Sequence, residues 1–153
     1  MSLEHRVYAV TGGASGIGLA TAKLIAHRGG TVCIADVSHP NDESQFSMVS
    51  KVDVSDRQQV EDWIADIKNR FGRLDGAANV AGIIGKHHGV KTVAELEDEE
   101  WHRIMNVNLT GMMYCLRAEL NNITDGGSIV NMASIHATTG TCPHHPASLT
   151  PQA

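Results

Sequence analysis

The sequence lacks the features that place a protein in or on a membrane. No apolar run approaches the roughly 20 residues needed to span a bilayer, and residues 1–5 contain no signal-peptide core. Positive charge is also scarce, because 12 Lys and Arg residues stand against 17 Asp and Glu residues, and no basic cluster stands out. These absences predict a cytoplasmic protein with no membrane partner and no nucleic-acid partner.

Cysteine is scarce as well. Cys33, Cys115 and Cys142 are an odd number at unrelated spacings, which argues against a disulfide framework and a zinc site. The pair His87-His88 could begin a metal site, but adjacent side chains point in different directions and no carboxylate or cysteine stands at ligand spacing. We therefore predict no bound metal.

What the chain does have is the composition of one globular domain: 153 residues, 42% hydrophobic and 19% charged. Strand-like apolar runs alternate with helical periodicity, which is typical of a parallel sheet with crossover helices. The expected strands are residues 6–10, 31–35, 46–52, 74–80 and 128–134. The sequence thus predicts an α/β fold on a parallel sheet of about five strands.

A glycine-rich loop follows the first expected strand and opens the first expected helix. Glycines permit positive φ and let the backbone approach a pyrophosphate, whose negative charge then lies against the free N–H groups of the helix start. This predicts a dinucleotide site of Rossmann type, the alternative being a glycine-rich connection in some other α/β protein. The candidate cofactor-binding residues are Thr11, Gly12, Ser15, Gly16, Ile17 and Gly18.

Asp36 ends the second expected strand, about twenty residues beyond that loop. A carboxylate there can accept hydrogen bonds from both hydroxyls of an adenosine ribose, and its charge repels a 2′-phosphate. Neither Ala14 nor Ser15 is basic, so the loop offers no counter-charge for NADP. We predict NAD as the cofactor; the alternative for Asp36 is a solvated turn residue.

The first two helices carry expectations about their faces and starts. In the first, four apolar residues should lie near one face: Ile17, Ala20, Leu24 and Ile25. In the second, Ser55-x-x-Gln58 fits a capping box. Its core-facing stripe is Val60, Trp63, Ile64, Ile67 and Phe71.

The third helix should begin in the acidic run of residues 95–100, where carboxylates meet the positive end of the helix dipole. Its apolar stripe contains Trp101, Ile104, Met105, Met112, Cys115 and Leu116, together with one amide, Asn108. A buried amide without partners costs about 1–3 kcal/mol. We therefore expect Asn108 to make specific hydrogen bonds, with a purely structural role as the alternative.

In this order, the motifs resemble those of the short-chain dehydrogenase/reductase family. The resemblance covers residues from about 6 to about 140 and includes the Thr-Gly-x-x-x-Gly-x-Gly loop, the Asp53-Val54 pair and the Asn-Leu-x-Gly stretch that begins at Asn108. It also includes Asn79-Val80-Ala81-Gly82, where Val80 replaces the second Asn of the family signature. The implied fold is a Rossmann-type, doubly wound parallel sheet.

The resemblance also implies roles for these residues. Asp53 would meet the adenine amino group, with Val54 beside it, and the small residues Ala81 and Gly82 would leave room for the cofactor while Asn79 ties adjacent strands together. On the catalytic side, Asn108 would support a helix turn and a water leading to the catalytic lysine. Ser134, at the end of the fifth expected strand, would polarise the substrate carbonyl.

The family's Tyr-x-x-x-Lys motif does not occur in this chain. Tyr8 and Tyr114 are its only tyrosines, and Gly12 and Ala118 stand at their lysine positions. Ala147 and Pro151 stand near the expected motif, and the chain departs from the family from about Thr141. We expect a dinucleotide-binding domain over residues 1–140 and an irregular tail over 141–153, which a C-terminal truncation, a frameshifted gene model, a retained intron or a splice product would explain.

Relative to the family, such a chain would lack the helix with the catalytic pair and the last strands, so a homo-oligomer interface would be incomplete and the fifth strand would be an exposed edge. Family chemistry is hydride transfer between a nicotinamide and a small-molecule alcohol or ketone. We expect this chain to bind NAD with little or no turnover. The alternatives are a non-catalytic module that binds NAD or a partner subunit, and a partly unfolded product.

Overall fold

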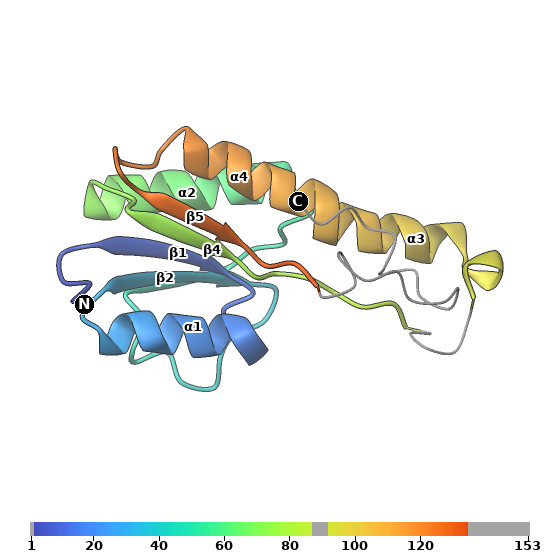
Figure 1. The fold of residues 1–153 in the computed structure, drawn as a ribbon, viewed down its shortest axis with the longest axis horizontal. Coiled ribbons are helices and arrows are strands. Elements are labelled where there is room, and N and C mark those ends of the chain that lie inside the picture. The colour runs from blue at the N-terminus through green and yellow to red at the C-terminus, as the bar shows by residue number, and fades with distance from the viewer. Residues whose placement is uncertain (1, 87–91, 135–153) are drawn as a thin grey trace.

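The computed structural model describes residues 2–86 and 92–134. Its centre is a five-stranded sheet in which every neighbouring pair is parallel and the order is β3-β2-β1-β4-β5 (Figure 1). The strands are β1 (Val7–Thr11), β2 (Thr31–Asp36), β3 (Met48–Lys51), β4 (Gly76–Asn79) and β5 (Ser128–Asn131). The predicted parallel sheet of about five strands is confirmed.

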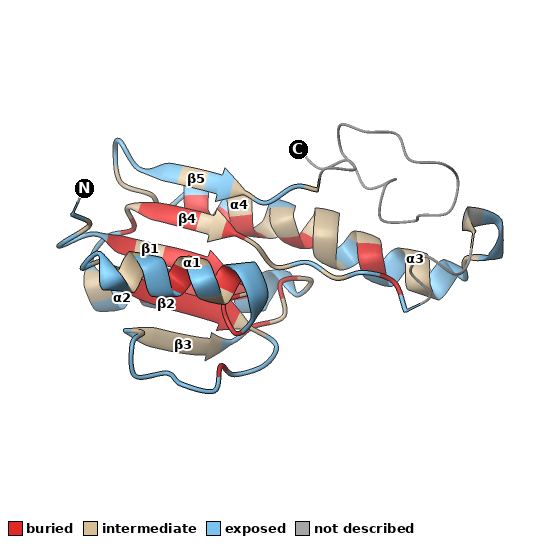
Figure 2. Cartoon of the chain, turned by 60° about the horizontal axis from the view of Figure 1, so that its bottom comes forward, coloured by how far each residue is buried: buried red, intermediate tan, exposed pale blue. Residues whose placement is uncertain are grey.

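The helices cover both faces of this sheet, which makes it doubly wound. In Figure 1, α1 lies on one face, whereas α2 and α4 lie on the other and α3 extends beyond the carboxyl ends of the strands. The bounds are α1 (Gly16–His27), α2 (Arg57–Phe71), a 3-10 turn η1 (Val93–Glu95), α3 (Asp98–Met105), a π-helical segment η2 (Asn106–Gly111) and α4 (Met112–Leu120). Figure 2 shows β1, β2 and β4 mostly buried between these layers.

The register of the sheet brings the strand ends together. Thr11 pairs with Asn79, and Asn79 pairs with Asn131, so β1, β4 and β5 end side by side. Asp36 pairs with Lys51 on the other side of the sheet centre. The loops that follow all these strands therefore leave from one edge, which is where open α/β folds bind ligands.

The predicted apolar face of α1 is wrong except at Ile25. Ile17 is 60% and Leu24 is 50% exposed, and Ala20 is exposed too, whereas the buried residues of the helix are Gly18 and Ala22. A Cβ on Gly18 would collide with the carbonyl oxygen of Gly12. The helix thus packs against the sheet through its smallest residues, because a close approach of two backbones leaves no room for large ones.

The start of α2 also differs from the expectation. Its N-cap is Asp56 rather than Ser55, and the Asp56 carboxylate accepts from the backbone N–H groups of Gln58 and Gln59. An aspartate can take this position because it offers the same type of acceptor as serine, one residue further along. The core-facing stripe is confirmed: Val60, Trp63, Ile64 and Ile67 are buried, and Phe71 packs against the same cluster.

The expected third helix is not continuous. The acidic entry is confirmed, since Asp98, Glu99 and Glu100 form the first turn of α3, but the six residues of η2 interrupt the helix before α4 begins. A π-helical segment shifts the facing of everything after it. As a result, the buried residues of α4 are Cys115, Ala118 and Glu119, while Met112 and Leu116 are only half-buried.

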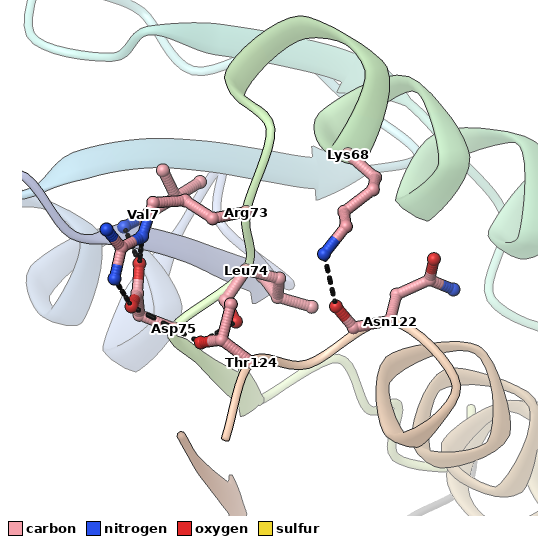
Figure 3. Close-up of polar contacts among 7 residues, drawn as sticks. All are labelled: Val7, Lys68, Arg73, Leu74, Asp75, Asn122 and Thr124. Carbon is pink, nitrogen blue, oxygen red and sulfur yellow. Dashed lines mark hydrogen bonds and ion pairs between the residues drawn. The ribbon is translucent and has the colours of Figure 1, made fainter. Parts of the chain in front are cut away.

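Polar contacts join segments at the opposite end of the sheet, where the strands begin (Figure 3). The Asp75 carboxylate accepts from the Val7 N–H at 2.9 Å and from Arg73 Nε at 2.7 Å. Thr124, before β5, donates its hydroxyl to the Leu74 carbonyl at 2.9 Å, and Lys68 of α2 donates to the Asn122 carbonyl at 3.2 Å. The bonds of Asp75 and Thr124 join the segment before β4 to β1 and to the segment before β5, and the bond of Lys68 joins α2 to the segment after α4. All of them lie at the end of the sheet where the strands begin.

Among the residues that the structure describes, β3 and β5 are the two edge strands of the sheet, and Val130 on β5 is 61% exposed. Within the described ranges, no helix has the length and apolar character needed to cross a bilayer. The expected tail over 141–153 lies outside the described residues.

Candidate functional site

A cavity of about 1080 Å³ opens where the strands end. It is lined by the end of β2, by the segments that follow β1, β3 and β4, by the first turn of α1, by α3 and η2, and by Met132 after β5. Predicted cofactor-binding residues in its wall are Gly12, Ser15, Gly16, Ile17, Gly18, Asp36, Asp53, Val54, Ala81 and Gly82. The structure therefore brings together residues from four separate predicted motifs.

The glycine loop is shaped by close backbone contacts. Gly12 has a φ of 68°, and a Cβ there would lie 2.9 Å from the Cα and the nitrogen of Ala81. Only glycine fits this combination of left-handed backbone and close approach. The loop then leads into α1, whose N-cap Ser15 makes no side-chain capping bond. The first N–H groups of a helix have no partner within it, so this end of α1 can accept an anion at the cavity.

Asp36 is held in a fixed orientation at the end of β2. Its Oδ2 accepts from the Ala14 N–H at 3.0 Å, and its Oδ1 accepts from both the N–H and the hydroxyl of Ser38 at 3.0 Å. A carboxylate has about four lone-pair sites. The bond from Ala14 joins the glycine loop to β2, and the two bonds from Ser38 fix the turn that follows the strand. Together they leave acceptor capacity on the carboxylate for a ribose hydroxyl.

Asp53 has a similar local arrangement further along the cavity wall. Its Oδ1 accepts from the Ser55 N–H at 2.9 Å and from the Ser55 hydroxyl at 2.7 Å, and its own N–H donates to Gln59. The Ser55 and Gln59 side chains therefore orient the carboxylate as well as the start of α2. This position suits a carboxylate that accepts a hydrogen bond from a ligand amino group.

Thr11 and Asn79 lie behind the wall rather than in it. Both are buried, and the Thr11 hydroxyl oxygen accepts from the N–H groups of Val80 and Ala81 at 3.1 and 3.2 Å. Thr11 thus fixes the segment after β4 against the glycine loop. The two residues support the site without lining it.

Asn108 makes the specific hydrogen bonds that the sequence requires of it. Its Oδ1 accepts from the Ile83 N–H at 2.9 Å, and its Nδ2 donates to the Ile83 carbonyl at 2.9 Å. Asn108 therefore joins η2 to the segment after β4. Ser134 lies three residues beyond β5, and Met132, two residues before it, lines the cavity.

The sequence prediction missed the α3 side of the cavity. Glu99, His102, Arg103 and Asn106 line it. Arg103 is not a free cation there, because Glu100 accepts from its Nε at 2.8 Å and from its Nη2 at 2.9 Å. Arg103 and the Lys86 N–H together lower the pKa of Glu100 to about 2. The acidic run was the available signal, but its pattern shows the helix start and not which side chains face a cavity.

Comparison with known proteins identifies this arrangement. A sequence profile described as Enoyl-(Acyl carrier protein) reductase matches residues 12–148, which is most of the chain. The chain belongs to the short-chain dehydrogenase/reductase family. It is 54% identical to the short-chain dehydrogenase/reductase ABA4 of Pyricularia oryzae over 94% of this chain, and 44% identical to the chanoclavine-I dehydrogenase ifgE of Penicillium roqueforti over 89% of it.

Solved structures agree with this family. The ligand-free aldohexose dehydrogenase of Thermoplasma acidophilum superposes with a TM-score of 0.88 at 27% identity, covering 98% of this chain. A short-chain dehydrogenase of Burkholderia cenocepacia in complex with NADP shares the fold, with a TM-score of 0.85 at 23% identity. The chain spans 57% of the length of the Pyricularia relative and 57% of the Thermoplasma structure.

Members of this oxidoreductase family bind a nicotinamide cofactor, and the cavity has the parts that such a cofactor requires: an anion-accepting helix start, a close backbone approach at Gly12 and carboxylates at two strand ends. Within residues 2–86 and 92–134, no group of three or more His, Cys, Asp or Glu side chains could hold a metal ion. The pair His87-His88 lies outside the described residues.

Proposed function

We propose that this chain binds NAD in the cavity at the strand ends, and that its family chemistry is hydride transfer between the nicotinamide and a small-molecule alcohol or ketone. The observation that carries the proposal is the orientation of Asp36, whose carboxylate lines the cavity while the Ala14 N–H links it to the glycine loop. The pyrophosphate would lie against the start of α1, and the adenosine ribose would lie at Asp36.

The charges around the cavity favour NAD over NADP. Asp36 places a negative charge where a 2′-phosphate would lie. Arg103, the guanidinium in the cavity wall, is paired through two hydrogen bonds with Glu100. The loop residues Ala14 and Ser15 carry no charge. A bound 2′-phosphate would therefore have to approach a carboxylate with little compensation.

Turnover needs a group that moves a proton at the substrate oxygen as hydride leaves or arrives. Ser134 can polarise a carbonyl with its hydroxyl, but a serine hydroxyl alone is a weak acid. Tyr8 lies within β1 and Tyr114 lies on α4, and neither is followed by lysine four residues later. We therefore propose that this chain binds the cofactor with little or no turnover. As a separate proposal, we assign it to the cytoplasm.

A partner subunit is the second candidate for what this chain binds. The specific observation that favours it is that β5 is an edge strand within the described part of the chain: Val130 on it is 61% exposed, and Met132 directly after it is 39% exposed. An apolar edge strand is a surface to which another chain can add. The partner would be a second copy of this chain or another subunit of the same fold.

Calorimetry with NAD and with NADP, together with a turnover assay on a panel of alcohols and ketones, tests the proposal. We expect NAD to bind more tightly than NADP and no substrate to be turned over at a rate typical of the family. Turnover at such a rate would contradict the non-catalytic part. A protein with a sharp melting transition that binds neither dinucleotide would contradict the cofactor assignment.

A further inference from the structure

Within residues 2–86 and 92–134, Glu119 on α4 is the one charged residue that the fold buries completely, with 0% of its surface exposed. Its Oε2 accepts from Asn79 Nδ2 at 2.9 Å. The same Nδ2 donates to Asn131 Oδ1 at 3.0 Å, so both N–H groups of the Asn79 amide are used. The Asn79 side chain therefore connects α4 to β5 at the end of β4.

Two oxygens remain in this cluster. Glu119 Oε1 and Asn79 Oδ1 are both buried, and neither has a hydrogen-bond partner among the described residues. Two hydrogen-bond acceptors without donors in one buried cluster lower the stability of the fold, because each has lost its bonds to water. They belong to two side chains that are already joined by one hydrogen bond. A carboxylic acid and a primary amide can join through two hydrogen bonds in one ring, so a single proton on Oε1 would satisfy both oxygens.

We propose that Glu119 carries a proton on the acid side of neutrality and then forms an acid–amide pair with Asn79, and that this pair holds the β4–β5 side of the cavity in the shape that binds the cofactor. The statement about the cofactor rests on the proposed function above; the statement about the pair does not. Glu119 is on this view a positioning residue. It acts through Asn79, because the next three residues, Val80, Ala81 and Gly82, line the cavity.

The surroundings favour the proton. Burial raises the pKa of Glu119 to about 7, against which its hydrogen bond with Asn79 acts only in part. β4, β5 and η2 contribute no titratable group. α4 itself carries Tyr114, Cys115 and Arg117. Cys115 lies one turn before Glu119, and its pKa rises to about 12, chiefly through burial and further through Glu119. Arg117 is exposed and lies 5.4 Å from the centroid of the half-buried Tyr114 ring.

α2, which packs against α4, does not supply a compensating cation inside this cluster. Its half-buried Lys68 donates to the Asn122 carbonyl beyond the end of α4. The other charged residues of α2 are exposed or half-exposed: Arg57, Glu61, Asp62, Asp66 and Arg70.

Backbone hydrogen bonds on either side of Asn79 connect the acid–amide pair to β5 and to the glycine loop. The Met132 N–H donates to the Asn79 carbonyl at 2.9 Å, and the Val80 and Ala81 N–H groups donate to Thr11. When Glu119 loses its proton, one bond of the pair is lost and a charge is left in an apolar layer. We expect the junction between β4 and β5 to loosen and NAD affinity to fall about tenfold between pH 6 and pH 8.5.

Carbon-13 NMR of glutamate side-chain carboxyls tests the protonation directly, with E119Q assigning the signal and E43Q, on an exposed loop, as the matched control. We expect the Glu119 signal to titrate with a midpoint near 7. A midpoint below pH 5 would overturn the proposal, because the carboxylate would then be ionised at neutral pH with some other group, such as a water, as its partner.

Unfolding equilibria of the wild type and E119Q at pH 5 to 8.5 give a second measurement. The folded-state pKa is raised, so the native protein holds the proton more tightly than the unfolded chain. Wild-type stability relative to E119Q should therefore fall as pH rises from about 4.5 to about 7 and stay level above that. We expect the two unfolding constants to diverge on the order of 100-fold by pH 8. Parallel pH profiles would contradict the pair.

The positioning role is read from amide protection and from binding. We expect protection factors of the Val80, Ala81 and Met132 N–H groups to fall several-fold from pH 6 to pH 8 in the wild type and to stay level in E119Q, whose amide supplies both halves of the pair. E119A should lower them at every pH. Equal behaviour of E119Q and E119A would overturn the role.

NAD affinity should follow the same pattern across these variants. If NAD binds to none of them at any pH, the proposed function fails, while the carboxyl titration and the amide protection still decide for or against the pair.

Discussion

Asn108 forms two hydrogen bonds with the backbone of one residue, Ile83, accepting from its N–H and donating to its carbonyl. The side chain thereby replaces the contacts that a neighbouring strand would make and holds the segment after β4 against η2. N108A would leave both backbone groups of Ile83 without this partner. We expect it to lower the free energy of unfolding by about 1–3 kcal/mol.

Urea unfolding of N108A checks this expectation, with N69A on the exposed face of α2 as the control. The control should change stability by less than 0.5 kcal/mol, as surface substitutions usually do. Hydrogen exchange of the Ile83 N–H should accelerate in N108A alone. Equal stability of the two variants would show that the bonds contribute nothing.

Gly12 and Gly72 both have a left-handed backbone, but only Gly12 lies against another backbone segment. G12A should lose measurable NAD binding and destabilise the fold, because its Cβ would lie 2.9 Å from two backbone atoms of Ala81. Gly72, at the end of α2, has a similar φ of 76°, but a Cβ there meets nothing within 4 Å. G72A should therefore cost only the backbone strain, about 1 kcal/mol. Thermal unfolding and NAD calorimetry on both variants separate the two effects.

The parts of this structure that the sequence predicts are those in which a local pattern has one physical meaning. The short apolar runs before the glycine loop and before Asp36 are typical of covered strands of a parallel sheet, and the carboxyl ends of parallel strands lie side by side. The α2 stripe is likewise local, because the 3.6-residue period alone determines which side chains face the core.

The errors occur where tertiary packing decides. Ile17 and Leu24 are large and apolar, yet α1 turns Gly18 and Ala22 toward the sheet because the backbones approach closely. Glu119, for which the sequence analysis made no prediction, shows the same limit. Its burial depends on the π-helical turn of η2, which shifts the facing of α4, and on Asn79, a residue 40 positions earlier in the chain. No local periodicity contains that information.

Asp36 should control the choice between NAD and NADP. D36N removes the negative charge of the side chain and keeps its size. We therefore expect the ratio of the NADP to the NAD dissociation constant to fall roughly tenfold, mainly because NADP binds more tightly. Asp42 is a matched control, since its Oδ1 likewise accepts from the N–H of the serine two residues later, at 2.9 Å, but it does not line the cavity. Calorimetric titration of D36N and D42N with both dinucleotides measures the ratio. An unchanged ratio in D36N would exclude the carboxylate from the ribose site.

Asp75 should make the fold sensitive to acid at the edge of the sheet opposite the cavity. Burial acts to raise the pKa of its carboxyl, but the hydrogen bonds from Arg73 and from the Val7 N–H outweigh it, so the pKa lies below its ordinary value of 3.8. A lowered folded-state pKa contributes stability that is fully present above about pH 4 and is lost as pH falls through the folded-state pKa. D75N should therefore be less stable than the wild type by about 1–2 kcal/mol at pH 7. This difference in the free energy of unfolding should shrink progressively below pH 4.

Urea unfolding at pH 7, 5, 4 and 3 measures the difference, with D125N in the exposed turn before β5 as the control. A difference that stayed constant across these pH values would show that the charge of Asp75 is not what joins β1 to β4.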